Sequence, residues 1–328
     1  MYQTLESLPI KSSEILEIGV VTAPDDIIGP AAQKLLVHKS TEWQFHLAAA
    51  LSGEIELLET RFYLGMLDGV PVGNVMTVES NGIGILGHVF THPDHRRKGI
   101  CQAIMSRLME DFRARDGSVL LLGTGFESPA YWIYHSFGFR SLKGGFMRYD
   151  TPPGLNEDNW FKPGPVSPAP LAWRHWPLLA LLGAQSSGEI LRSAAWKLFG
   201  IGNLETPVVR TLVDQKQEKG ASGVVLETGS GTVVGCATLH PTSGGPNGWP
   251  GVWLFDHFTH ANFQDKSGEL LEAINWPAGK IISYVGTGAP EKATVLEAHG
   301  FEREGMVRGF LRLSDASHDV WLYGKIVS

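Results

Sequence analysis

The sequence predicts a mixed α/β protein, with helices and a mixed sheet in each of two tandem domains. Two observations lead to this fold class. Three consecutive strands are followed by a helix, a strand, a helix and further strand material, and the same order returns in the second half. The chain has 328 residues, 43% of them hydrophobic, which suffices for two domains of ordinary size. We expect a first domain over residues 1–152, a Pro- and Gly-rich linker over 153–170 and a second domain over 171–328.

Turn dipeptides separate three antiparallel strands in the first half. Asp68-Gly69 lies between two apolar runs, which is a strong hairpin signal. Asn81-Gly82 provides a second turn of the same kind and leads into a third apolar run. The predicted strands are residues 61–69, 70–80 and 83–91.

A helix, a buried strand and a second helix follow. Residues 100–115 carry apolar side chains at helical spacing with polar side chains between them. Residues 118–124 are continuously apolar, which is typical of a buried strand that is parallel to its neighbour. A short helix is expected from Pro129 to just before Gly138, with strand material continuing to about residue 150.

The second half repeats this plan after a helical segment, which we expect over residues 171–200. The repeat indicates duplication of a whole domain and not a solenoid of short repeats. The predicted strands are 224–228, 232–240, 251–260, 280–288, 301–313 and 319–327, and the predicted helices are 268–274 and 290–299.

Composition excludes several classes of function. The net charge of −7 disfavours a general nucleic-acid binder, because neutralising phosphates needs a basic face. The two cysteines, Cys101 and Cys236, form no CxxC pair, so neither a disulfide framework nor a zinc site is expected. The first residues lack the pattern of a signal peptide, and no apolar run is long enough to span a bilayer. We expect a cytoplasmic protein with neither nucleic acid nor membrane as a partner.

The stretch HPDHRRKGICQAI, residues 92–104, places three basic residues and a glycine before an apolar-periodic helix. The first turn of a helix leaves backbone N–H groups unpaired, and the helix dipole is positive there. Gly99 allows a bulky group to approach the backbone closely. The stretch therefore predicts an anion site for a group such as a pyrophosphate.

Two motifs in the first half resemble those of a known superfamily. Residues 89–101, VFTHPDHRRKGIC, resemble motif A of the GNAT N-acetyltransferases, whose core is Q/R-x-x-G-x-G/A. Arg96 and Gly99 match its first and central positions, and Cys101 stands where Gly or Ala is usual. Residues 128–139, SPAYWIYHSFGF, resemble the second signature, A-x-x-x-Y-x-x-x-G-F. The matching residues are Ala130, Tyr134, Gly138 and Phe139. The resemblance implies two tandem acyl-CoA N-acyltransferase (GNAT) folds.

The resemblance implies acetyl-CoA as a co-substrate and an acyltransferase as the class of enzyme. In this family the amides that follow the leading Gln or Arg hold the pyrophosphate, and the preceding strand pairs with the pantetheine arm through its backbone. The residues expected to bind the co-substrate are Val89, Thr91, Arg96, Arg97, Lys98, Gly99, Ile100 and Cys101.

Catalysis of amide formation requires a general acid for the leaving thiolate and a route for the proton of the amine. Tyr134 stands where the family places its general acid. Ile85 stands where some members carry a glutamate base, and isoleucine cannot accept a proton. A water relay without a single base is one alternative. The candidate bases in the sequence are His88, Glu79 and Glu127.

Histidines around this loop raise the question of a metal. His88, His92 and His95 span a strand end and a proline-containing loop, so their rings are not expected to converge. We expect no metal site.

The second copy keeps the fold pattern and loses the chemical residues. Matching Gly268 to the glycine of motif A places Asp265 at the arginine position and Leu270 at the last small position. Leu296 stands where the first copy has its tyrosine. We expect a degenerate GNAT-like domain that no longer binds coenzyme A.

The expected reaction is transfer of an acetyl group to a primary amine of a small molecule or peptide, by direct attack on the thioester. Two alternatives stay open: a non-catalytic module that binds acyl-CoA, and an acyltransferase directed to thiols or larger acyl groups. The sequence does not identify the acceptor, and homo-oligomerisation is left open.

Overall fold

The chain forms two compact units, each built around one large mixed sheet. A computed structural model describes residues 2–152, 157–244, 248–313 and 316–328. The N-terminal unit comprises Met1–Leu155 and Trp173–Ala180, and the C-terminal unit comprises Asn156–Ala172 and Leu181–Ser328. The predicted α/β class with two tandem sheets is confirmed.

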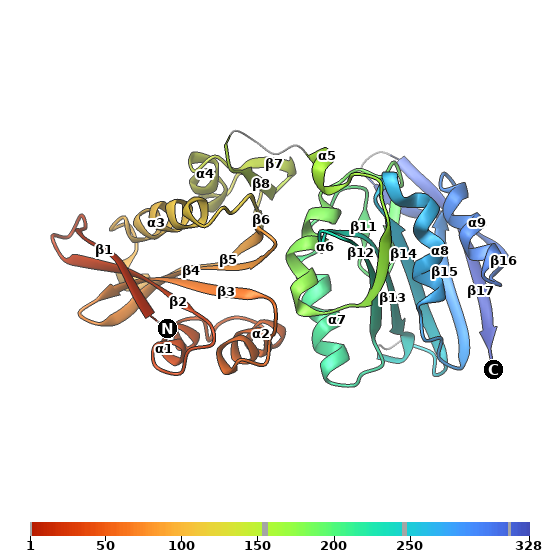
Figure 1. Ribbon diagram of the computed structural model, residues 1–328, viewed down its shortest axis with the longest axis horizontal. Helices are drawn as coiled ribbons and strands as arrows, with labels where there is room; N and C mark the ends of the chain where they lie inside the picture. The colour runs from red at the N-terminus through yellow and green to blue at the C-terminus, as the bar shows by residue number, and fades with distance from the viewer. Residues whose placement is uncertain (1, 153–156, 245–247, 314–315) are drawn as a thin grey trace. The chain divides into compact units, whose positions relative to one another are not determined.

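The N-terminal sheet has eight strands in the order β1-β2-β3-β4-β5-β6-β8-β7. Only β5 and β6 are parallel neighbours, as the apolar run at 118–124 predicted. Helices α1 and α2 cover one face of this sheet, and α3 and α4 cover the other (Figure 1). The strands are β1 Tyr2–Pro9, β2 Ile15–Thr22, β3 Glu59–Leu67, β4 Val70–Ser80, β5 Ile83–Thr91, β6 Val119–Gly123, β7 Arg140–Lys143 and β8 Phe146–Asp150. The helices are α1 Gly29–Leu35, α2 Thr41–Ser52, η1 Pro93–His95, α3 Ile100–Ala114 and α4 Pro129–Ser136.

Local sequence explains the central hairpins and the main helix. Asp68 and Gly69 both have positive φ, as do Asn81 and Gly82, and this geometry matches the twist of antiparallel strands. Helix α3 buries one apolar stripe against the sheet. The stripe consists of Ile100, Ile104, Met105, Leu108, Met109 and Phe112.

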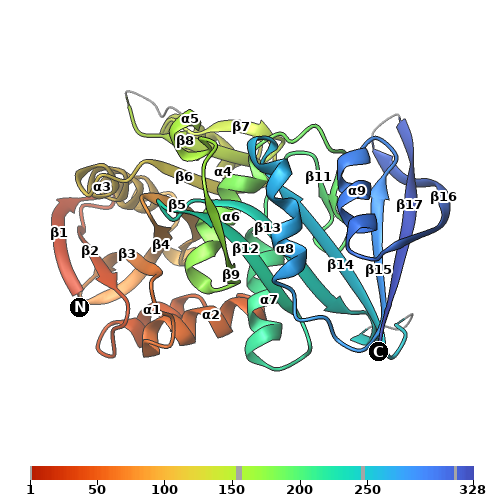
Figure 2. The same ribbon diagram turned by 45° about the vertical axis from the view of Figure 1, so that its right-hand side comes forward.

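The C-terminal sheet follows the same plan. Its strand order, taken from β9, is β9-β12-β13-β14-β15-β17-β16, which matches the order from β2 to β7 in the first sheet. The parallel pair β14–β15 is therefore the counterpart of β5–β6. Helix α7 lies on one face, and α8 and α9 lie on the other (Figure 2). The strands are β9 Val166–Pro170, β12 Ser222–Thr228, β13 Val233–Pro241, β14 Val252–Thr259, β15 Gly279–Gly286, β16 Glu302–Leu313 and β17 Ala316–Val327. The helices of this unit are α5 Glu157–Trp160, α7 Glu205–Lys216, η3 Thr242–Gly244, η4 Ala261–Lys266, α8 Ser267–Glu272 and α9 Pro290–Ala298. The segment η2 Trp173–His175 and most of α6 Trp176–Gly183 belong to the N-terminal unit.

The prediction of helix over 171–200 is wrong for its second part. Helix α6 ends at Gly183, where an added Cβ would lie 2.8 Å from the carbonyl oxygen of Gly202. The chain then forms a short antiparallel hairpin from β10, Leu191–Ser193, and β11, Leu198–Phe199. The predicted linker contains β9, an edge strand that tolerates its prolines because it pairs only with β12. Residues 153–156 of that linker lie outside the described residues.

The predicted pairing of Gly268 with Gly99 is also wrong. Gly99 precedes α3 as its N-cap, whereas Gly268 lies inside α8. The buried residues of α8 match those of α3 when Ser267 is paired with Cys101, which shifts the register by three residues. Asp265 then stands at the position of Gly99.

The tyrosine position is matched as the sequence predicted. The amide of Phe139 donates to the Tyr134 carbonyl at 3.2 Å, and the amide of Phe301 donates to the Leu296 carbonyl at 3.1 Å. In both units a glycine with positive φ precedes the phenylalanine.

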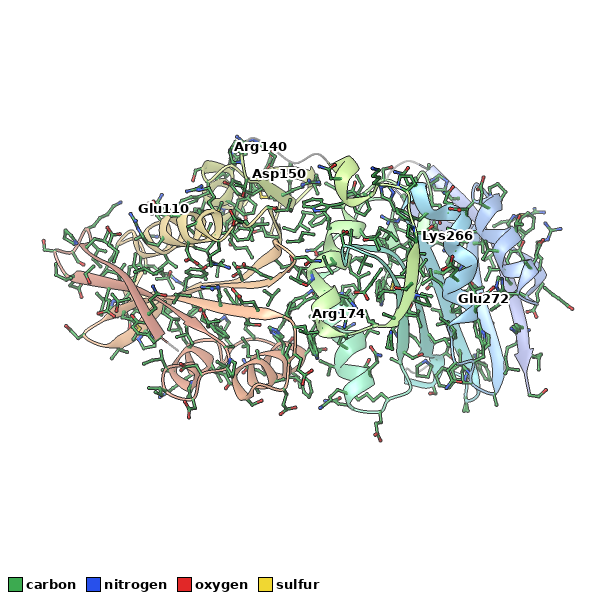
Figure 3. All side chains as sticks on the ribbon, viewed as in Figure 1. Glu110, Arg140, Asp150, Arg174, Lys266 and Glu272 are labelled. Atoms are coloured by element: carbon green, nitrogen blue, oxygen red, sulfur yellow. The ribbon has the colours of Figure 1, made fainter. Side chains whose placement is uncertain are left out.

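Charged side chains lie mostly at the surface of each unit, as Glu110 on α3 and Glu272 on α8 illustrate (Figure 3). Within the described ranges, every helix is too short or too polar to cross a bilayer.

Candidate active site

The N-terminal unit contains an open cleft where β5 and β6 separate. The two strands pair only from Ile83 to Ile85 and from Val119 to Leu121, and β5 then continues alone to Thr91. The cleft has a volume of about 620 Å³. Its lining comes from the end of β5, the loop that follows, the start of α3, the start of α4 and the turn between β1 and β2. The lining residues are Lys11, Val89, Phe90, Thr91, His95, Arg96, Arg97, Gly99, Ile100, Cys101, Gln102, Ser128, Pro129, Ala130 and Ile133.

The loop before α3 exposes backbone amides to this cleft. The first bond of the helix runs from the Ala103 amide to the Gly99 carbonyl at 3.0 Å, so the amides of residues 100–102 have no intrahelical acceptor. Arg97 and Gly99 have φ of +65° and +90°. A Cβ on Gly99 would contact nothing within 4 Å, because the glycine faces open space. This corner suits an anion by geometry and by helix dipole.

The basic side chains of the loop differ in their surroundings. Arg96 is exposed, and its Nε donates to the Thr91 carbonyl at 3.1 Å. Lys98 does not line the cleft, because its Nζ donates to Glu14 Oε2 at 2.7 Å. The hydrogen bonds from Lys98 and Ser12 lower the pKa of Glu14 below its usual value. Lys11, in the turn after β1, also lines the cleft and was not among the predicted site residues.

A bulge shapes β5 at the cleft. The pairing with β4 shifts between Asn74 and Met76, which inserts one extra residue into β5. His88 takes a φ of +50° there, and Asn74 Nδ2 donates to the His88 carbonyl at 2.8 Å. Asn74 is fully buried, and this bond is partly buried. The bulge redirects the backbone just before Val89, the first residue of β5 that lines the cleft.

Helix α4 forms the opposite wall. The Ser128 hydroxyl caps the helix by accepting from the Tyr131 amide at 3.2 Å. Ala130 and Ile133 face the cleft. Tyr134 is 6% exposed and packs against Phe139 with ring centroids 6.1 Å apart. It belongs to the apolar core and is not one of the residues that line the cleft.

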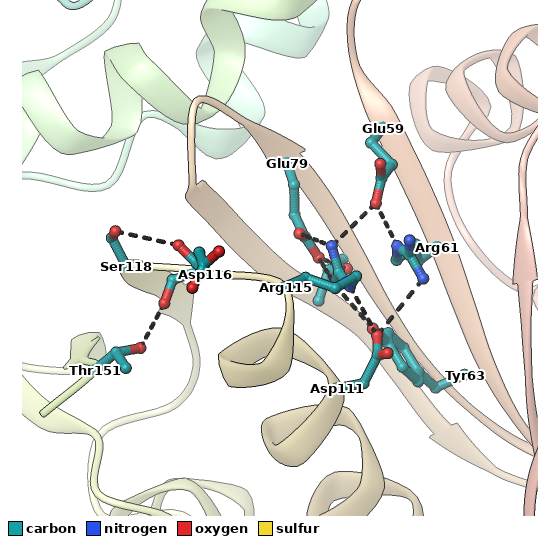
Figure 4. A network of polar contacts seen from close by, with 11 residues as sticks. Glu59, Arg61, Tyr63, Glu79, Asp111, Arg115, Asp116, Ser118 and Thr151 are labelled. Carbon is teal, nitrogen blue, oxygen red and sulfur yellow. Dashed lines mark hydrogen bonds and ion pairs between the residues drawn. The ribbon is translucent and has the colours of Figure 1, made fainter.

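Glu79 takes part in a different structure, a network of ion pairs on the α3 side of the sheet (Figure 4). Its carboxylate binds Arg115 through two bonds of 2.7 and 3.0 Å and accepts from the Thr77 hydroxyl. Arg115 also contacts Asp111 and Glu59. Burial lowers the pKa of Arg115, but hydrogen bonding and the charge of Glu79 outweigh it and raise the pKa above its usual value. Glu79 thus joins the C-terminal end of α3 to the sheet and lies outside the cleft lining.

The other two candidate bases are also outside the cleft lining. Glu127 is exposed. The His88 ring packs edge-on against Trp43 of α2 with centroids 5.0 Å apart. Burial, with smaller effects from His46 and Lys39, lowers the pKa of His88 to about 3. His88 is therefore neutral at pH 7 and binds a proton weakly.

A second buried histidine, His46, packs among tryptophan side chains in the same unit. His46 is fully buried between Trp173 and Trp176, with ring centroids at 5.3 and 5.0 Å, and burial lowers its pKa to about 3. In the described part of the chain, no group of three or more His, Cys, Asp or Glu side chains is placed to hold a metal ion.

Comparison with known proteins identifies the segment that carries this cleft. Residues 59–141 match the family model described as acetyltransferase (GNAT) domain. These residues form a GNAT domain. The match runs from β3 into β7 and includes both motifs found in the sequence.

Solved structures resemble about half of the chain. A GNAT superfamily phosphinothricin acetyltransferase from Sinorhizobium meliloti, in complex with AcCoA, is 13% identical, with a TM-score of 0.39 over 50% of this chain and 89% of that chain. A ribosomal-protein-alanine N-acetyltransferase from Brucella melitensis is 17% identical, with 0.39 over 49% and 99%. An N-acetyltransferase from Staphylococcus aureus is 14% identical, with 0.39 over 50% and 99%. No curated protein matches the chain.

Proposed function

We propose that the chain is an acetyl-CoA-dependent N-acetyltransferase whose reaction takes place in the GNAT domain. The observation that carries this proposal is the open cleft, which joins a separated pair of strands to the amide-rich, basic corner before α3. A thioester carrier with a diphosphate needs both features: a long slot for its arm and an anion site at one end.

The anion site would hold the diphosphate through the backbone. The unpaired amides of residues 100–102 point out of the first turn of α3, and Gly99 leaves room for phosphate oxygens. Arg96 and Arg97 would add positive charge from the rim, and Lys98 would act mainly through its ion pair with Glu14, which fixes the loop.

The reaction forms a C–N bond and breaks a C–S bond. The amine nitrogen attacks the thioester carbonyl carbon, negative charge develops on the carbonyl oxygen, and the coenzyme A thiolate leaves. Val89 lines the cleft directly after the bulge at His88, and its amide is our candidate donor to that oxygen. Tyr134 lies in the core next to Ile133, which lines the cleft, and it is our candidate acid, which would give its hydroxyl proton to the thiolate.

We infer that water, and not a side chain, accepts the proton of the attacking amine. Glu79 is held by Arg115, Glu127 is exposed outside the cleft lining, and His88 has a pKa of about 3. None of the three lines the cleft, so none is placed to take the proton of an amine bound there. Turnover should therefore rise with pH as the acceptor amine itself loses its proton.

Release of free thiol from acetyl-CoA in the presence of a panel of primary amines and peptides tests the proposal. We expect release that depends on at least one amine, an N-acetylated product of matching mass, and loss of both in Gly99→Glu. Binding of acetyl-CoA without release for any amine would instead support a non-catalytic acyl-CoA module. Release that depends on thiols and not on amines would support a thiol-directed acyltransferase.

A further inference from the structure

The C-terminal unit has the strand geometry of a cleft but almost no space in it. Strands β14 and β15 pair only from Val252 to Leu254 and from Lys280 to Ile282, as β5 and β6 do before they separate. Among the described residues, a cavity of about 70 Å³ lies beside the end of β15. The cavity lined by β14, α8 and α9, which corresponds to the cleft of about 620 Å³ in the N-terminal unit, measures about 10 Å³. A volume of that size holds about one water molecule.

The missing space is filled by the β10–β11 hairpin and the residues just before it, 189–199. This hairpin has no counterpart in the N-terminal unit, where only α1 and α2 lie between β2 and β3. Strand β10 lies against both β14 and β15, in the angle between them. Leu191 is 1% exposed and packs with Leu311 and Val320.

A buried carboxylate on β14 holds the hairpin from one side. Asp256 Oδ2 accepts from the Ala195 amide at 2.8 Å and from the Ser193 hydroxyl at 3.1 Å. Asp256 is 1% exposed. Gly235 on β13 corresponds to Gly73 on β4. Three residues further along these strands, Thr238 pairs with Asp256 and Met76 pairs with Gly87, so Asp256 takes the position of Gly87 in β5.

A buried lysine on α9 holds the hairpin from the other side. Counting back from the matched Leu296 places Lys292 at the position of Ala130, which faces the open cleft in the N-terminal unit. Lys292 Nζ donates to the Arg192 carbonyl at 2.8 Å. The Arg192 guanidinium lies 4.9 Å from the ring centroid of Phe258 on β14. The hairpin is thus bonded to both walls that would otherwise face each other across a slot.

The anion corner is closed by a second segment. Phe161 stacks on His260 with ring centroids 4.1 Å apart, and its carbonyl accepts from Asn262 Nδ2 at 2.9 Å. His260 and Asn262 begin the segment that corresponds to the loop before α3, and Asp265 stands at the position of Gly99. A carboxylate there repels phosphate. Strand β14 also pairs with β13 without the bulge that β5 has.

From these contacts we infer that residues 189–199 are the built-in occupant of the C-terminal cleft. The chain's own hairpin takes the space that an acyl-pantetheine arm would need, and Asp256 and Lys292 are the residues that hold it there. The C-terminal unit is therefore a degenerate copy that takes no acyl-CoA.

Hydrogen exchange of the full chain, followed with and without acetyl-CoA, tests this inference. We expect the Ala195 amide and its neighbours to be protected at least about tenfold over an open loop, with no change when acetyl-CoA is added. Acetyl-CoA should add protection only around the N-terminal cleft, at the turn that holds Lys11, at residues 89–102 and at the start of α4. The inference is overturned if acetyl-CoA protects β14 and α8, or if residues 191–199 exchange as fast as an open loop.

Substitution of Asp256, whose carboxylate accepts two hydrogen bonds from the hairpin, provides a second test. Asp256→Leu removes the acceptor of two hydrogen bonds and should raise exchange across 191–199 by about tenfold, whereas Asp256→Asn keeps one acceptor oxygen and should raise it less. The affinity of the N-terminal cleft for acetyl-CoA should stay within about threefold in both. Unchanged exchange in Asp256→Leu would contradict the assigned role. If the wild-type chain binds no acetyl-CoA, the proposed function fails, and the exchange of 191–199 still decides this inference.

Discussion

Replacing Glu79 with glutamine separates a structural role from a catalytic one. The Glu79 and Arg115 side chains are 8% and 24% exposed, so the pair is largely shielded from solvent. Removing one partner of a buried pair costs about 3–5 kcal/mol, and the partial exposure of Arg115 places this pair near about 2–3 kcal/mol. A unit of this size loses about 2–4 °C in Tm for each kcal/mol, so we expect Glu79→Gln to lower the Tm by about 5–10 °C.

Denaturant unfolding, combined with acetyl-CoA affinity and turnover below the transition, is the assay. Arg115→Met should destabilise by a similar amount, and the double variant should lose less than the sum, because the two residues share one interaction. Glu127→Gln is the matched control and should change unfolding by less than about 0.5 kcal/mol, since Glu127 is exposed. A Glu79→Gln variant with unchanged stability and abolished turnover would refute this reasoning and make Glu79 the base.

Further predictions concern the cleft and the pH dependence of folding. Tyr134→Phe should lower turnover by about 100-fold, measured by thiol release, with acetyl-CoA affinity within about threefold; full activity would place the acid elsewhere. Asn74→Ala should relax the bulge and so weaken binding of the thioester carbonyl. The ratio of affinities for acetyl-CoA and for its thioether analogue S-ethyl-CoA, which lacks that carbonyl, should fall by about 2–10-fold, and an unchanged ratio would show that the amide after the bulge does not bind the carbonyl. Because burial lowers the pKa of His46 and His88 to about 3, the unfolded chain binds their protons first as pH falls. Unfolding free energy should therefore fall below about pH 6.5 by up to about 1.4 kcal/mol per pH unit for each histidine, and His46→Phe should reduce that slope. An equally steep slope in His46→Phe would contradict the assignment.

Turn chemistry and periodicity predict much of both sheets, but no prediction covered β1, β2, α1, α2 or α7. Asp68-Gly69 and Asn81-Gly82 fix the central hairpins because both dipeptides accept positive φ, and the apolar stripe of α3 is visible in the sequence. The elements from β3 to β8 and from β12 to β17 lie within a few residues of their predicted bounds, with strand 139–150 resolved into β7 and β8. The hairpin within 189–199 was missed because its strands are only three and two residues long, too short to show alternation.

The site was predictable where local sequence determines it. The loop before α3 combines a glycine, basic residues and a helix start within one stretch, and seven of the eight predicted contact residues line the cleft. The exception, Lys98, pairs with Glu14, which is 84 residues away in the chain. The pairing of Glu79 with Arg115 and the clamp of Asn74 on the His88 carbonyl depend on tertiary contacts in the same way. A positive φ at a histidine likewise carries no sequence signal of its own.

Calorimetric titration of the full chain with acetyl-CoA, repeated on two variants at Gly99, tests the anion corner directly. The account predicts one bound acetyl-CoA per chain. Gly99→Ala should weaken binding by about 10-fold, from backbone strain at a φ of +90° alone, and Gly99→Glu should abolish it by adding negative charge where phosphates bind. Two bound molecules per chain, or wild-type affinity in Gly99→Glu, would contradict the account.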